Sequence, residues 1–150
     1  MAARQHYETS VQVNAPVAAV WQVLTDPAGY REWNPEILQV DGTMAAGARI
    51  KVRVKVRGGA IRTLVLRVTA FDPPSRLEWT GGLPFGLFVG RRTFVLTPRN
   101  AGTLFTMHLS MTGPCAPLIL RSLGDRQPDI DAFSAALRRR VDGRTSAGTP

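Results

Sequence analysis

Apolar residues recur along this chain at two different spacings, which separate helical segments from extended ones. After residue 7, valines at every second position alternate with polar residues, the pattern of a strand with one buried face. A stripe at helical spacing follows, formed by Val17, Val20, Trp21 and Leu24. The spacing predicts a strand over residues 7–14, then a helix, then a second short helical turn that carries Tyr30 and Trp33 and ends before Pro35.

From about residue 37 to residue 111 the alternation is almost entirely that of strands. It is clearest over residues 50–57, where the valines share one face with Ile50. The opposite face is a basic stripe formed by Lys51, Arg53, Lys55 and Arg57. Turn signals such as Gly58-Gly59 and Asp72-Pro73-Pro74-Ser75 separate the runs. The region therefore predicts six strands.

The C-terminal part of the chain is helical in pattern. A long helix is indicated by Ile130, Phe133, Leu137 and Val141. A shorter helix is expected over residues 117–123, and Pro128 is expected to kink or break the chain between the two. Residues 143–150 are small and polar and predict a disordered tail.

The fold class follows from the order of these elements. A meander of antiparallel strands cannot leave its apolar face in water, and the C-terminal helix is the only element long enough to cover that face. The sequence thus predicts an α+β fold of about seven strands, with two short helices after the first strand, in a single domain over residues 1–142.

Composition is that of an ordinary globular protein, with 44% hydrophobic and 20% charged residues among 150. A single cysteine, Cys115, excludes an intrachain disulfide and favours a reducing compartment. The first residues lack the apolar segment of a signal peptide, and no apolar run is long enough to span a bilayer. We therefore expect a cytoplasmic protein.

The net charge is +8, and 17 of the 19 basic residues are arginine. The basic stripe could dock an acidic protein, or it could simply be a solvated face. Nucleic acid is a less favoured partner, because no aromatic residues interleave with these cations for bases to stack on.

Several short motifs occur in a familiar order. They are Val11-Gln12-Val13-Asn14-Ala15-Pro16, Val20-Trp21, Leu24-Thr25-Asp26-Pro27, Trp33-Asn34-Pro35, the segment 71–79, the strand Thr93-Phe94-Val95-Leu96-Thr97-Pro98 and the closing helix. Together they resemble the SRPBCC superfamily, which groups START lipid-transfer domains, the birch-pollen allergen family and bacterial polyketide cyclase-like proteins. The resemblance runs from about Tyr7 to Val141 and is specific to a fold rather than to a function.

The resemblance implies a helix-grip fold, in which a curved sheet wraps around the C-terminal helix and encloses an apolar cavity. It implies a hydrophobic ligand such as a lipid, an isoprenoid, a polyketide or another aromatic compound. The cavity wall is expected to include Trp33, Val52, Val54, Leu66, Trp79, Arg92, Phe94, Phe105, Met107, Leu109 and Phe133. Some relatives are enzymes and many only bind, so a binding protein is the first hypothesis. A polyketide cyclase or aromatase is the alternative, and an interaction module that uses the basic stripe is a second alternative.

Few residues in this chain suit catalysis or metal binding. His6 and His108 are far apart in the sequence, His108 should face away from the cavity, and neither predicts a metal site. Relatives of this type often carry polar residues on the inner face of the last strand, where this chain has Met107 and Leu109. Arg92 shares parity with inward-facing Phe94, so it must pair with a carboxylate, reach solvent or hold a polar ligand group. It is too basic for proton transfer, as is Arg62, a weaker candidate of the same kind, so no catalytic residue and no cofactor is assigned.

Overall fold

The computed structural model describes residues 5–147. The N-terminal part holds the first strand and three short helical elements: β1 (His6–Val13), α1 (Val17–Leu24), the 3-10 turn η1 (Pro27–Gly29) and α2 (Tyr30–Trp33). Six strands follow: β2 (Ile37–Asp41), β3 (Arg49–Lys55), β4 (Ile61–Asp72), β5 (Arg76–Leu83), β6 (Phe88–Arg99) and β7 (Gly102–Thr112). Two 3-10 turns, η2 (Arg57–Gly59) and η3 (Pro84–Gly86), join β3 to β4 and β5 to β6. The chain ends in α3 (Ala116–Leu123) and α4 (Gln127–Ala147).

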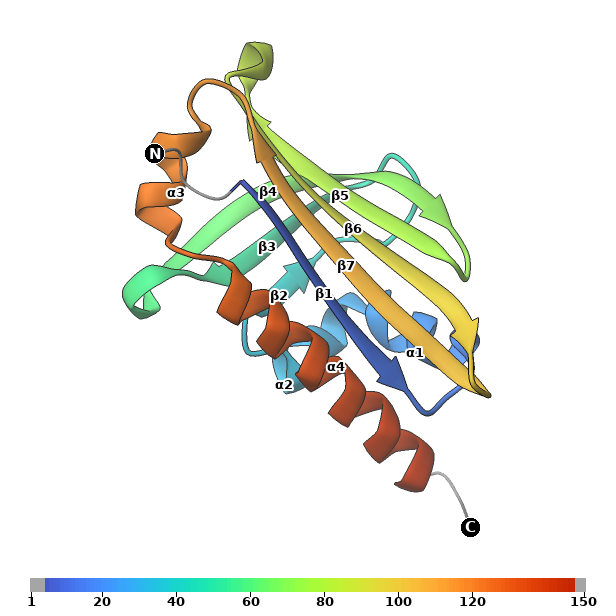
Figure 1. The fold of residues 1–150 in the computed structure, drawn as a ribbon. Coiled ribbons are helices and arrows are strands. Elements are labelled where there is room, and N and C mark those ends of the chain that lie inside the picture. The colour runs from blue at the N-terminus through green and yellow to red at the C-terminus, as the bar shows by residue number, and fades with distance from the viewer. Residues whose placement is uncertain (1–4, 148–150) are drawn as a thin grey trace.

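All seven strands form one antiparallel sheet in the order β1-β7-β6-β5-β4-β3-β2. The sheet curves into a half-barrel, and the long helix α4 lies alongside β1 on its open side (Figure 1). The α+β helix-grip architecture expected from the sequence is thus confirmed, with its strand count and its long closing helix.

Strand parity decides which side chains enter the core. On β3, Ile50, Val52 and Val54 are buried, whereas Lys51 and Arg53 on the opposite face are exposed. The apolar stripe of α4 that was expected from helical spacing is buried in full and comprises Ile130, Phe133, Leu137 and Val141. Burial of these two apolar faces against each other is the main driving force for docking the helix on the sheet.

Aromatic rings fill the middle of the space between the sheet and α4. Phe133 of α4 stacks on Phe105 of β7 at a centroid distance of 6.1 Å and meets the edge of Trp33 at 5.5 Å. Phe94 joins Phe133 at 5.7 Å and Trp79 at 4.9 Å. These ring contacts form the aromatic part of the core between the sheet and α4.

Two helical boundaries differ from expectation. Pro128 does not kink α4, because it lies in the first turn, where its missing N–H has no partner to lose. An Asp125 carboxylate oxygen accepts a hydrogen bond from the Gln127 N–H at 3.0 Å and caps that turn. The helix also continues past Gly143 to Ala147, within the stretch expected to be a tail. Residues 148–150 of the expected tail lie outside the described residues.

Strand β3 ends at Lys55, two residues earlier than the alternation indicated. Gly58, with φ of 72°, allows the tight turn η2 that starts at Arg57. In the part of the chain described by the structure, no helix is long and apolar enough to cross a membrane.

Candidate ligand-binding site

A cavity of about 430 Å³ lies at one end of the sheet, between its inner face and α3. Its wall combines apolar side chains of β3, β4 and β7 with Trp79 of β5, and α3 contributes Ile119 and Leu123. Three arginines, Arg62, Arg92 and Arg126, are the charged residues of the wall.

The cavity opens where two neighbouring strands separate. β4 and β5 are paired from the Asp72–Arg76 end only as far as Arg67 and Thr80. Beyond that pair, residues 62–66 of β4 and 81–83 of β5 both line the cavity. Leu64 and Val65 are exposed there, which marks this end as the mouth.

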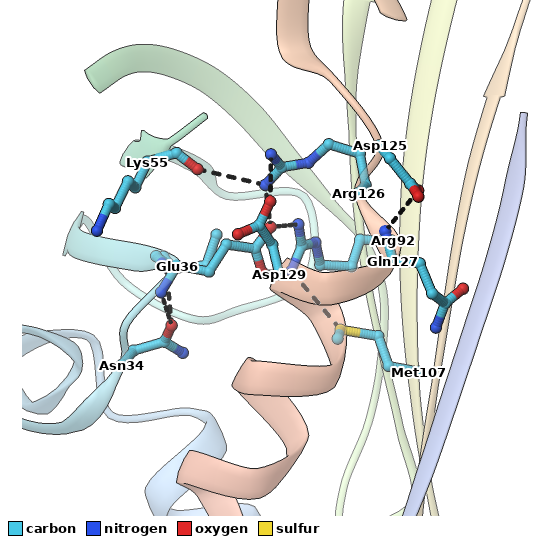
Figure 2. A network of polar contacts seen from close by, with 10 residues as sticks. Asn34, Glu36, Lys55, Arg92, Met107, Asp125, Arg126, Gln127 and Asp129 are labelled. Carbon is cyan, nitrogen blue, oxygen red and sulfur yellow. Dashed lines mark hydrogen bonds and ion pairs between the residues drawn. The ribbon is translucent and has the colours of Figure 1, made fainter. Parts of the chain in front are cut away.

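A fully buried carboxylate lies at the inner end of the cavity. Glu36 Oε1 accepts a hydrogen bond from Arg92 Nη1 at 2.8 Å, and Glu36 Oε2 accepts one from Arg92 Nη2 at 2.7 Å. Arg126 Nη2 donates to the same Oε2 at 2.6 Å. Figure 2 shows Glu36 between the two guanidinium groups. Since bidentate pairing is the strongest arrangement for these groups, the carboxylate is held firmly.

Local sequence explains why Glu36 points inward. Pro35 forces the preceding residue into an extended conformation, and Asn34 has φ of −94° and ψ of 122°. The Asn34 side-chain oxygen then accepts hydrogen bonds from the N–H groups of Glu36 and Ile37 at 2.9 and 2.8 Å. This turn fixes the start of β2, so the Glu36 side chain enters the sheet interior from its edge strand.

Opposing effects set the ionisation of this network. Burial by itself would raise the pKa of the Glu36 carboxyl, but Arg92 and Arg126 outweigh it and the pKa lies below its usual value. Burial by itself would lower the pKa of Arg92, but the Glu36 carboxylate outweighs it and the pKa lies above its usual value. Glu36 and Arg92 therefore stabilise each other in their charged forms.

Asp129 is the outer member of the network. Arg126 Nη1 donates to Asp129 Oδ2 at 2.9 Å, and the Asp129 side chain is 39% exposed. Burial and the nearby Glu36 carboxylate raise the pKa of Asp129 more than the contact with Arg126 lowers it. The network thus has two guanidinium groups and two carboxyl groups, one acidic partner for each arginine.

The structure divides the wall residues expected from the sequence into two groups. Six of them line the cavity: Val52, Val54, Leu66, Trp79, Arg92 and Leu109. The other five lie in the packed aromatic core or beside it: Trp33, Phe94, Phe105, Met107 and Phe133. Their contact with a ligand stays a prediction, but for the second group it would require the core to open.

Sequence reasoning missed Glu36, Arg126 and Asp129. The signal for Glu36 was indirect: an inward-facing Arg92 required a carboxylate partner, and one of 11 acidic residues had to supply it. Arg92 is 8% exposed and bonded to Glu36, so of the three roles considered for it, pairing with a carboxylate is the one observed.

The remaining candidates lie away from the cavity. His108 and His6 meet on the outer face of the sheet, with ring centroids 5.8 Å apart, although the sequence separated them widely. Cys115 is a half-buried free thiol at the start of α3. The basic stripe is exposed at Lys51, Arg53 and Lys55, and the side chain of Arg57 lies outside the described residues.

Comparison with known proteins adds the family. Residues 4–143 match the family described as polyketide cyclase / dehydrase and lipid transport. The chain belongs to this family. The resemblance noted in the sequence is thereby confirmed, but the family includes more than one activity. None of the curated proteins matches the chain.

Solved structures show the same fold. An aromatase/cyclase from a Streptomyces species, Zhui, is 20% identical, with a TM-score of 0.78 over 97% of this chain and 99% of its own. A protein from Mesorhizobium loti is 26% identical, with a TM-score of 0.70 over 94% and 98% of the two chains. A START superfamily protein from Mycobacterium smegmatis is 16% identical, with a TM-score of 0.70 over 94% and 99%.

Proposed function

We propose that this protein binds a neutral, mainly apolar small molecule in the cavity between the sheet and α3. The observation that carries this proposal is a largely apolar cavity of about 430 Å³ whose two innermost charges, those of Arg92 and Arg126, are already paired with Glu36. The volume lies within the range of about 300–1,000 Å³ that is common for small-molecule sites.

Charge balance argues for a neutral ligand. A free guanidinium in an apolar pocket would favour a carboxylate or phosphate, but Arg92 already gives two hydrogen bonds to Glu36. An anionic ligand would have to compete with Glu36 for Arg92 and would add uncompensated charge to a buried site. A carbonyl or hydroxyl group could share the remaining N–H donors without that penalty. Lipid, isoprenoid and polyketide ligands of low charge are all compatible with this site.

A cyclase or aromatase is the alternative, and the wall residues support it less. Among the described residues that line the cavity, the ionisable side chains are arginines, with no carboxylate, imidazole or thiol. Arginine is too basic to act as a general acid or base near neutral pH. A reaction in this cavity would therefore depend on confinement and orientation of the substrate.

Two dyes with the same ring system test the proposal. N-phenylnaphthylamine is neutral, and anilinonaphthalene sulfonate adds one negative charge. We expect the neutral dye to bind with one site per chain and the sulfonate to bind about tenfold more weakly or not at all, because it adds an unpaired buried charge. Fluorescence titration measures both affinities.

A pair of tryptophan variants locates the site. Leu109→Trp fills the cavity from β7 and should abolish binding of the neutral dye, because Leu109 lines the wall. Thr106→Trp places the same ring on the opposite face of β7 and should leave binding unchanged. If the wild-type protein binds neither dye, or if Leu109→Trp binds as well as the wild type, the proposed function is wrong.

A further inference from the structure

Exposed apolar side chains gather around the mouth of the cavity. Within the described residues, the large apolar side chains that are most exposed are Ile61, Leu64, Val65, Leu83, Phe85, Leu87 and Leu118. Three of these line the cavity directly: Leu64, Val65 and Leu83. Three others are next to a lining residue in the sequence, namely Ile61, Leu87 and Leu118, and Phe85 lies in η3, two residues after Leu83. Exposed apolar side chains concentrated around a cavity mouth favour a binding surface.

Phe85 is the clearest case. It is 98% exposed, and its backbone has φ of 60°, which is unusual for a bulky residue. The turn η3 thus leaves a phenyl ring exposed to water and holds the Phe85 backbone in a strained conformation. In Figure 1 this turn, α3 and the tip between β3 and β4 lie toward the same end of the molecule, away from α1 and the end of α4.

The same segments contain no acidic residues. The sequence has no Asp or Glu between Asp41 and Asp72, and none between Glu78 and Asp125. On the outer face of the sheet, Lys55 lies opposite Ile61 and Lys51 opposite Val65, so cations and exposed apolar side chains alternate across β3 and β4. A second copy of the chain would present the same positive charge, so self-association through this surface is unfavourable.

We propose that this end of the molecule docks on an anionic phospholipid bilayer. The apolar side chains enter the region between headgroups and acyl chains, and the basic stripe meets the anionic headgroups. The mouth between β4 and β5 then faces the lipid, so an apolar ligand passes between bilayer and cavity without crossing water. This docking rests on the proposed function, since it supplies that ligand.

Vesicle flotation tests the docking surface. The protein should float with vesicles of phosphatidylcholine and phosphatidylglycerol, with an affinity about tenfold or more above that for phosphatidylcholine alone, and salt should weaken binding. Phe85→Ser with Leu118→Ser should lose vesicle binding. Arg53→Glu with Lys55→Glu should lose the preference for the anionic lipid. The control Arg138→Glu with Arg139→Glu makes the same charge change on α4 and should bind as the wild type does.

The outcomes separate docking from ligand binding. Binding of the neutral dye without vesicle binding overturns the docking and leaves the proposed function standing. Loss of both overturns the proposed function as well. Binding to soluble polyglutamate that does not depend on Phe85 would assign the basic stripe to an acidic protein instead. Dimerisation in sedimentation experiments that is lost in the Phe85 variant would assign the apolar surface to a second copy.

A separate cluster on the opposite edge of the sheet carries a second inference. Glu8 of β1 lies directly opposite His108 of β7, and His6 is on the same face two residues earlier. His108 Nδ1 is 3.3 Å from Glu8 Oε1, and one ligand atom from each of the three residues lies within 4.8 Å of the others. In a tetrahedral zinc site neighbouring ligand atoms are about 3.4 Å apart, so the third side chain needs only a small rotation.

We infer that His6, Glu8 and His108 bind a divalent transition-metal ion such as zinc. Two imidazoles and a carboxylate suit zinc, nickel or copper, whereas magnesium and calcium prefer oxygen ligands alone. Water completes the coordination, because His6 and Glu8 are exposed. The ion would join the edge strand β1 to β7, and it makes no contact with the cavity.

Competition with a chelating dye measures this site directly. Zinc should bind with one equivalent per chain and raise the melting temperature by about 5–10 °C at a hundredfold excess over Kd. His6→Ala and His108→Ala should each weaken binding by about tenfold or more, whereas Ser10→Ala, on the same face, should not. Absence of saturable binding, or equal binding by both histidine variants and the wild type, overturns the assignment.

Discussion

Removing the negative charge of Glu36 tests the buried network most directly. In Glu36→Gln, the guanidinium groups of Arg92 and Arg126 keep their charge but lose the carboxylate that lies 2.6–2.8 Å away. Loss of one member of a buried ion pair costs about 3–5 kcal/mol. For a chain of this length that corresponds to a fall in melting temperature of about 6–20 °C.

Thermal and urea unfolding, followed by circular dichroism, measure this loss. Glu32→Gln is the matched control, because Glu32 pairs with Arg140 at 2.7 Å but its side chain is 59% exposed. That control should cost at most about 1 kcal/mol. Replacing Glu36, Arg92 and Arg126 together with apolar residues should recover most of the stability, since no unpaired charge is then buried.

The pH dependence has a definite sign. The pKa of Glu36 is lower in the folded protein than in the unfolded chain, so its contribution is present above the unfolded value and is lost as pH falls through the folded value. The wild type should therefore lose more stability on acidification than Glu36→Gln does. A loss of less than about 1 kcal/mol in Glu36→Gln, or an equal loss of stability on acidification in both proteins, would show that water reaches the network and would refute this account.

Three other substitutions follow from the same contacts. Met107→Trp should cost about 1–3 kcal/mol, because Met107 is fully buried outside the cavity, and a variant as stable as the wild type would show that empty volume reaches it. Tyr30→Phe should cost about 1–2 kcal/mol of unfolding free energy, because the Tyr30 hydroxyl donates a hydrogen bond to the Leu24 carbonyl at 2.6 Å. Burial also raises the pKa of the Tyr30 phenol, so its ultraviolet ionisation signal should appear only when alkali unfolds the protein. Asp129→Asn removes a carboxyl group whose pKa is raised by folding, so in the wild type its contribution to the free energy of unfolding weakens as pH rises through that pKa. The variant should therefore become more stable relative to the wild type from acidic to neutral pH, and an unchanged difference between the two pH profiles would exclude that role.

Most of the fold was predictable because strand parity and helical spacing are local signals. The alternation on β3 and the stripe on α4 each determined which face is buried without reference to the rest of the chain. Boundaries were less accurate where a single glycine or proline decided them. At Pro128 the same residue that breaks a helix interior was compatible with a first turn, and only the cap by Asp125 distinguishes the two.

The candidate site was only half predictable, for a physical reason. Parity showed that Arg92 faces inward. Its partner Glu36 lies 56 positions away in the sequence, so no local pattern identifies it. The location of the cavity was likewise hidden, because it depends on how far the aromatic rings around Phe133 fill the half-barrel. Met107 and Leu109 have the same parity on β7, yet only Leu109 lines the cavity.

Arg126 also determines when the molecule can finish folding. It reaches Glu36 across 90 positions of the chain, from the link between the last two helices. Contacts between such distant positions form late, because a long loop must close first. A nascent chain that has emerged only through β7 can bring Glu36 and Arg92 together, but their open side stays in contact with water until residue 126 arrives. Exclusion of water from this end of the half-barrel is therefore coupled to synthesis of the chain as far as Arg126, and a fragment that ends before this residue cannot complete it.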